Sequence, residues 1–140
     1  MQKLRAITCE ILAMTEAILH AAEPPIDPPR LAELRKKVAL AHNTLFAEQE
    51  RALLQPLRQS GNPALMAIAR SCIDRDLEGR QMGLEHYQRW PLARILEDPF
   101  GYRADVRRVL DWMGTRTLYA EQTAYPALVG LISSLKRPAA

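Results

Sequence analysis

The 140-residue sequence lacks the residue patterns that mark the common classes of enzyme. It contains no glycine-rich phosphate loop, no G-x-S-x-G segment, no HExxH pair and no nucleophile with a nearby base. Nothing in the sequence therefore recommends catalysis, and we expect a protein that is not an enzyme.

Cysteines, charges of one sign and long apolar runs are also scarce. Cys9 and Cys72 lie far apart, without the CxxC or Cys/His spacing of a zinc site or a redox pair. The net charge of +3 comes from arginines spread along the chain, which does not indicate nucleic acid. No apolar run approaches the roughly 18 residues that cross a bilayer, and the N-terminus lacks a signal-peptide pattern. We expect a cytoplasmic protein that binds neither membrane nor nucleic acid.

Apolar residues at helical spacing are abundant. They recur at steps of three and four residues, and no stretch alternates as a strand does. Prolines and Gly61 divide the chain into four helices: one that stops before Pro24, one over about 28–60, one over 63–89 and one over about 102–135. Because two of the joints are short, we expect residues 1–140 to form a single all-α domain, an up-down-up-down four-helix bundle.

One segment of the sequence occurs twice. LFAEQERALLQPL (45–57) and LYAEQTAYPAL (118–128) each contain an aromatic residue, Ala-Glu-Gln and then a proline within apparent helix. The copies fall on the second and fourth helices, which are parallel in such a bundle, so they lie at similar height. Proline has no amide hydrogen, and we expect both helices to bend there.

This arrangement resembles the hemerythrin-like, HHE cation-binding family over essentially the whole chain. Glu50 stands six places before Pro56, and Glu121 stands five places before Pro126. The stretch YQRWPLARI (87–95) is similar to the corresponding stretch in alphaproteobacterial members. In metal-binding members the second and fourth helices each supply a histidine, a glutamate four or five places later and a proline ten places on. The other two helices add one histidine each, and together the ligands hold two irons.

The two helix prolines locate the corresponding ligand positions in this sequence. Counted back from Pro56, the histidine position falls on Phe46 and the carboxylate position on Glu50. Counted back from Pro126, the histidine position falls on Arg116, and only the acid five places on is retained. On the third helix the matching level offers Asp74 and Asp76 rather than a histidine. The vestigial metal-site positions are therefore Phe46, Glu50, Asp76, Arg116 and Glu121.

The chemistry at these positions disfavours iron. A di-iron centre needs roughly four to six protein ligands, and this chain supplies two or three. Phe46 fills ligand volume with hydrocarbon, and Arg116 brings a fixed positive charge. We expect a degenerate site without a cofactor, in a regulatory, sensing or interaction protein whose partner is a small ligand, another protein or a second copy. Either Arg116 pairs with Glu50 or Asp76 in the vacated centre, or Arg116, Glu50 and Glu121 flank the apolar stripe and point to solvent.

A second hypothesis stays open, in which the chain binds iron or oxygen through an altered ligand set. That set consists of Glu50, Asp76, Glu121 and His42. His42 lies on the apolar stripe of the second helix, where a histidine is either a core residue or a ligand, whereas His86 beside Glu85 is interpreted as solvent-facing. The aromatic residues that we consider either as interface anchors or as internal packing are Trp90, Tyr102 and Trp112.

Overall fold

The computed structural model describes residues 1–137, and all regular structure within that range is helical. The expectation of an all-α protein is confirmed. The long helices are α1 (Gln2–Ala21), α2 (Pro28–Gln49), α4 (Pro63–Arg89) and α6 (Pro99–Tyr119). The shorter elements are the α-helices α3 (Gln55–Arg58), α5 (Leu92–Glu97) and α7 (Tyr125–Leu135), and the π-helical segments η1 (Glu50–Leu54) and η2 (Ala120–Ala124).

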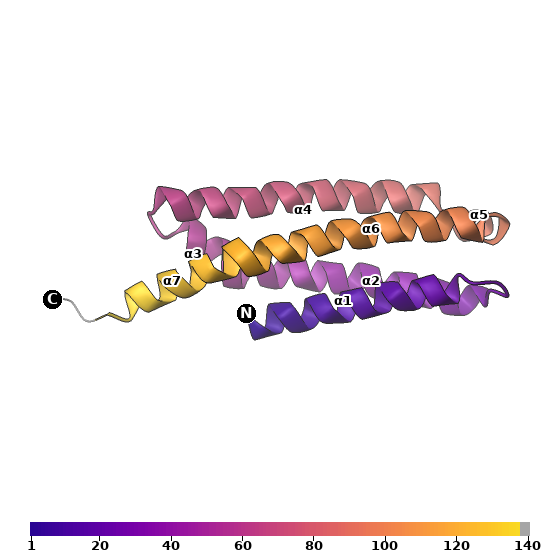
Figure 1. Cartoon of the computed structure of the whole chain (residues 1–140), viewed down its shortest axis with the longest axis horizontal. Coiled ribbons are helices and arrows are strands. Elements are labelled where there is room, and N and C mark those ends of the chain that lie inside the picture. The colour runs from indigo at the N-terminus through magenta and orange to yellow at the C-terminus, as the bar shows by residue number, and fades with distance from the viewer. Residues whose placement is uncertain (138–140) are drawn as a thin grey trace.

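The long helices lie side by side as a bundle, as Figure 1 shows. The α1–α2 linker and α5 lie at one end, and the N-terminus and the turn between α3 and α4 lie at the other. α7 continues the line of α6 past the N-terminus. Across the part of the chain described, none of the helices combines the length and the apolar character that a membrane crossing needs.

Local signals set the helix ends. The Asp27 side chain accepts a hydrogen bond from the Arg30 amide at 3.3 Å and caps α2, and Asn62 accepts one from the Ala64 amide at 2.9 Å and caps α4. Gly61 precedes that cap with a φ of 70°, a left-handed conformation that glycine adopts without strain. These starts agree with the sequence prediction.

The connection between α4 and α6 is more regular than expected. The segment predicted as a simple linker contains α5, and α6 begins at Pro99 rather than near Tyr102. Asp98 caps α6 by accepting a hydrogen bond from the Gly101 amide at 2.9 Å. Asp98 and Pro99 thus mark a helix start, which apolar periodicity alone does not reveal.

Both copies of the repeated segment contain a π-helical turn. The residue before each proline donates its amide to a carbonyl five residues back, from Gln55 to Glu50 and from Tyr125 to Ala120. A proline ring would clash with the carbonyl four residues back in a regular α-helix, and the wider turn relieves that clash. The bend expected at the first proline is visible in Figure 1, where α3 leaves the line of α2 toward α4.

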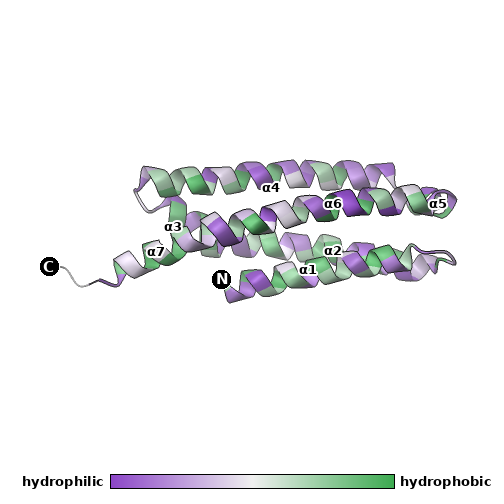
Figure 2. Ribbon diagram, in the orientation of Figure 1, coloured by the Kyte–Doolittle hydropathy of each residue, from purple (hydrophilic) through white to green (hydrophobic). Residues whose placement is uncertain are grey.

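The buried apolar side chains form two groups. The first group, here the N-terminal core cluster, consists of Leu4, Ile7, Ile11, Leu45, Leu53, Leu54, Leu57, Ala69, Cys72, Met113, Ala124, Tyr125 and Leu128. The second, here the distal core cluster, consists of Ile18, Ala22, Leu31, Trp90, Ile95, Tyr102 and Val106. Figure 2 shows hydrophobic and hydrophilic residues interspersed along each long helix, as amphipathic packing requires.

The buried face of α4 differs from the predicted stripe. The apolar spacing along residues 63–89 predicts that Leu77 and Leu84 lie inside, but they are 57% and 53% exposed. The buried residues of α4 are Ala69, Cys72 and Asp76. Because the side chain of Asp76 points inward, those of Leu77 and Leu84, which share a different face of the helix, point outward.

Candidate functional site

A closed polar network crosses the bundle interior between α2, α4 and α6. Arg116 donates from Nε to Asp76 Oδ1 at 2.8 Å and from Nη2 to Gln49 Oε1. Gln49 donates in turn from Nε2 to Asp76 Oδ2. The side chains of Arg116 and Asp76 are only 12% and 11% exposed. Of the two predicted arrangements for Arg116, the interior one is therefore confirmed, with Asp76 as its partner.

The two glutamates of the predicted site lie at the surface instead. Glu50 pairs with Arg58, and the hydrogen bond from that guanidinium lowers the pKa of the Glu50 carboxyl. Glu121 pairs with Arg5 at 2.7 Å, which likewise lowers its pKa. Of the two carboxylates considered as partners of Arg116, Glu50 bonds to Arg58 instead, which lies eight residues later in the sequence.

Phe46 contacts cations at the position where the family resemblance implies a histidine. The guanidinium carbons of Arg80 and Arg116 lie 4.3 and 5.9 Å from the centre of its ring, within cation–π range. The His42 ring stacks on it at 6.0 Å between centroids. Burial, reinforced by the charge of Arg116, lowers the pKa of His42 to about 4, so this imidazole is neutral at pH 7.

The residues present do not fit a di-iron centre. The proposed alternative ligands are dispersed, because Glu50 and Glu121 face solvent while both oxygens of Asp76 accept hydrogen bonds. Across residues 1–137, no three His, Cys, Asp or Glu side chains gather closely enough to hold a metal ion. A guanidinium also stands in the central network, where it would repel a cation.

A cavity of about 220 Å³ lies on the α5 side of Phe46, among α1, α2, α4 and α6. Its walls include members of both core clusters, so it lies where the two clusters meet. The lining residues are Thr15, Ile18, Arg35, Val38, Ala39, His42, Phe46, Gly79, Arg80, Gly83, His86, Tyr87, Tyr102, Val106, Val109, Trp112 and Met113. Its mouth lies between α2 and α4, where the lining residues Ala39, Arg80, Gly83 and Tyr87 are exposed.

Two glycines of α4, Gly79 and Gly83, line this cavity. A Cβ atom at Gly79 would overlap the indole ring of Trp112, so the ring occupies the space that a side chain would need. A Cβ atom at Gly83 would have nothing within 4 Å. Because glycine destabilises a helix interior by about 1 kcal/mol relative to alanine, the open position at Gly83 has no explanation in helix stability.

Arg35 is a buried cation on the cavity wall. It is 8% exposed, and its Nη2 donates to the Trp90 carbonyl at 2.8 Å. The guanidinium carbon lies 4.4 Å from the ring centre of Tyr87 and 5.6 Å from that of Tyr102. Among the ion pairs of the described residues, none involves Arg35. Aromatic faces and one carbonyl therefore surround this charge without a carboxylate.

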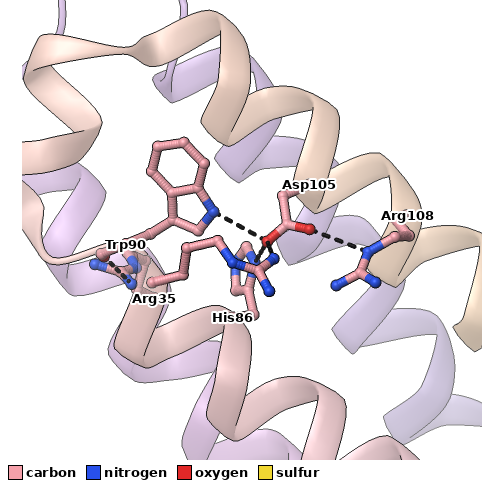
Figure 3. A network of polar contacts seen from close by, with 6 residues as sticks. Arg35, His86, Trp90, Asp105 and Arg108 are labelled. Carbon is pink, nitrogen blue, oxygen red and sulfur yellow. Dashed lines mark hydrogen bonds and ion pairs between the residues drawn. The ribbon is translucent and has the colours of Figure 1, made fainter.

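Asp105 is the centre of a polar network that includes His86, Trp90 and Arg108, as Figure 3 shows. Its Oδ2 accepts from His86 Nδ1 at 2.7 Å, from Trp90 Nε1 at 3.0 Å and from Arg89 at 3.2 Å, while Oδ1 accepts from Arg108 at 3.1 Å. Burial opposes the carboxylate charge, but the hydrogen bonds from His86 and Trp90 outweigh it and lower the pKa of Asp105.

His86 stands between that carboxylate and the cavity. Burial lowers its pKa more than the hydrogen bond to Asp105 raises it, so His86 is neutral at pH 7. Since a carboxylate only accepts, Nδ1 carries the proton and Nε2 is left as an acceptor. The interpretation of His86 as solvent-facing is wrong, because it is half-buried and lines the cavity.

The aromatic residues considered as interface anchors pack internally. Trp90 and Tyr102 are 5% and 1% exposed, and Trp112 is partly buried against Gly79. Tyr102 and Trp112 line the cavity. Internal packing, the other alternative, is the arrangement in the structure.

Sequence reasoning missed the residues that define the cavity. Arg35 lies seven places before His42 on the same face of α2, and Gly79 and Gly83 lie four places apart on one face of α4. Two glycines at that spacing within a helix are a readable sign of a close approach or an opening. No sequence pattern singles out Asp105, because three of its four hydrogen-bond donors lie on or next to α4, at least 15 residues away in the sequence.

Comparison with known proteins gives no relative. Neither the models of protein families, nor the curated proteins, nor the solved structures yield a match to this chain.

Proposed function

We propose that this chain is a non-enzymatic, hemerythrin-like, up-down-up-down four-helix bundle that binds a small, largely apolar ligand in its interior cavity, in a sensing or regulatory role. In this proposal the Arg116–Asp76–Gln49 network replaces the di-iron centre of the metal-binding relatives. The register supports the resemblance: Phe46 and Arg116 each stand four residues before a π-helical segment and ten before a proline.

The cavity is the observation that supports ligand binding. Native interiors are close-packed, with few voids larger than a water molecule. An engineered apolar cavity of ~150 Å³ binds benzene, and the cavity of about 220 Å³ here exceeds it. Its walls are mostly apolar and aromatic, with a few polar groups at defined places, as in binding sites for small molecules.

The lining residues also support a binding role over catalysis. Among the described residues around the cavity there is no serine, cysteine or lysine to act as a nucleophile. The one aliphatic hydroxyl, on Thr15, donates to the Ile11 carbonyl of its own helix at 2.7 Å. The His86–Asp105 pair therefore has no nucleophile to activate and serves to hold the wall.

Neutral apolar probes test this function. Toluene and indole, titrated into the full chain and followed by NMR or calorimetry, should bind in a saturable, one-to-one manner. Gly83→Leu should abolish binding, because the leucine would fill the open position at the mouth of the cavity. Gly114→Leu is the matched control, since its Cβ also meets nothing within 4 Å but lies outside the cavity lining. Absence of binding to the wild-type chain, or equal binding to both variants, would refute the function.

The replaced metal centre has a separate test. Protein purified from iron-supplemented cells should contain iron far below one equivalent per chain. Two equivalents of iron with an oxo-bridged absorption band would overturn the replacement and favour the altered ligand set.

A further inference from the structure

Arg35 is unusual among the charged residues of this chain. Charged side chains are seldom buried without a partner, because removing an ion from water costs several kcal/mol unless an opposite charge compensates it. Arg116, which is also well buried, forms an ion pair with Asp76. Arg35 has two tyrosine rings and a carbonyl oxygen, which compensate its charge only in part.

A purely structural role would leave most of the hydrogen-bond donors of Arg35 unused. Its one hydrogen bond caps the C-terminal end of α4 through the Trp90 carbonyl, but a guanidinium has five N–H donors. Of the buried side-chain polar atoms within residues 1–137, only Arg75 Nε is both fully enclosed and without a partner. The remaining N–H groups of Arg35 therefore keep access to water-sized space, and Arg35 lines the cavity.

The rest of the lining favours an anion. Arg80 adds a second positive charge at the mouth, and among the described lining residues there is no aspartate or glutamate. Asp105, which bonds to the lining residue His86, is also engaged by Trp90 and two surface arginines. A negatively charged group in the cavity would thus meet cations and no competing acid.

The shape of the walls favours a flat ring. The aromatic residues around the cavity are His42, Phe46, His86, Tyr87, Tyr102 and Trp112. Aromatic side chains stack on or meet the edge of a ligand ring favourably. A planar carboxylate also matches the fork of a guanidinium, which binds it through two parallel hydrogen bonds.

We propose that the ligand of this cavity is a small aromatic monocarboxylate, whose carboxylate pairs with the Arg35 guanidinium while its ring lies among the aromatic walls. This inference rests on the proposed function, because it names the class of ligand for the same cavity. It goes beyond that function by assigning Arg35 as the residue that determines specificity.

Calorimetry with benzoate and benzamide at neutral pH and constant ionic strength tests the proposal, because these probes have nearly the same shape and differ in charge. Benzoate should bind the wild-type chain at least about tenfold more tightly than benzamide. Arg35→Met should lower benzoate affinity at least about tenfold and leave toluene affinity within about threefold. Arg80→Met, at the exposed mouth, is the control and should change benzoate affinity by less than about threefold.

The outcomes separate the two proposals. If toluene binds and Gly83→Leu blocks it, but benzoate binds no better than benzamide, the ligand class is wrong and the proposed function stands. If no probe binds, the proposed function is wrong as well. Should Arg35→Met fail to fold, as judged by circular dichroism, Arg35→Lys replaces it: it keeps the charge without the fork and should lose part of the preference for benzoate. An unchanged preference in either folded variant would exclude Arg35 as the anchor.

Discussion

Arg116 Nε and Asp76 Oδ1 lie 2.8 Å apart inside the bundle, and the two residues are 40 positions apart in the sequence. Gln49 closes the network by bonding to both, so the carboxylate and the guanidinium share one set of hydrogen bonds. A buried pair of this kind contributes little net stability relative to apolar residues, but breaking it leaves an uncompensated charge. The network therefore connects α2, α4 and α6 through their side chains.

Removing one member of the pair should be costly. Asp76→Ala should lower the free energy of unfolding by about 3 to 5 kcal/mol, because Arg116 would remain buried without a counter-charge. The double variant Asp76→Leu/Arg116→Met should recover most of that loss, since neither charge remains. Urea unfolding followed by circular dichroism gives both values.

The surface pair of Glu50 and Arg58 is the control for that cycle. Glu50→Ala should change the free energy of unfolding by less than about 1 kcal/mol, because both side chains are largely exposed. Equal losses for Asp76→Ala and Glu50→Ala would show that the interior pair is not buried in solution.

The helix glycines should respond differently to alanine. Gly83→Ala and Gly114→Ala should each stabilise the protein by about 0.5 to 1 kcal/mol, since a Cβ meets nothing and alanine favours the helix. Gly79→Ala should destabilise it by about 1 to 3 kcal/mol, because the methyl group would displace the Trp112 ring. Thermal and urea unfolding measure the three changes.

Adding Trp112→Phe to the Gly79→Ala variant should restore part of the lost stability, because the phenylalanine ring is smaller than the indole. Of the two stabilising variants, only Gly83→Ala should also weaken toluene binding, because only Gly83 lines the cavity. A Gly79→Ala variant as stable as Gly114→Ala would contradict the packing of Trp112 against α4.

Stability should fall in mild acid partly through His42. Its pKa is lowered from 6.5 to about 4 by burial and by Arg116, so between these pH values the unfolded chain binds the proton and the folded chain does not. The contribution is fully present above pH 6.5 and is lost as the pH falls toward 4. His86, whose pKa is also lowered, acts in the same direction.

A substitution isolates that contribution. His42→Leu should reduce the loss of stability between pH 7 and pH 4.5 by about 2 kcal/mol, measured by urea unfolding at both pH values. His20→Leu, at an exposed position, is the matched control. Identical pH profiles for His42→Leu and the wild-type chain would mean that His42 is solvated in the folded state.

The helical class and most helix ends could be predicted because their causes are local. The Asp27 and Asn62 caps each act within three residues of their own position, and Gly61 needs no distant partner for its left-handed turn. The interior of α4 could not be predicted in this way. Periodicity favours Leu77 as the buried residue, whereas the structure buries Asp76 because Arg116 meets it from another helix.

The candidate site was predicted in part for the same reason. The proline register puts Phe46 and Arg116 at equivalent positions, and in the structure each stands four residues before a π-helical segment. Glu50 and Glu121 fall on carboxylate positions of that register, and the structure has the solvent-facing alternative for both, because each bonds to a surface arginine. The cavity depends on Gly79, which leaves room for the Trp112 ring, and on the open position at Gly83, and neither feature produces a hydrophobic pattern in the sequence.

Asp105 should control both stability and the shape of the cavity. Asp105→Ala removes the acceptor of the Trp90 indole and of His86, leaving buried donors unpaired at a cost of about 2 to 3 kcal/mol in the free energy of unfolding. Because the Trp90 carbonyl holds Arg35, the same variant should also weaken benzoate binding more than toluene binding. Asp111→Ala, at an exposed position of α6, is the control and should change neither. If Asp105→Ala lost stability but kept the wild-type preference for benzoate, Arg35 would not depend on this network for its position.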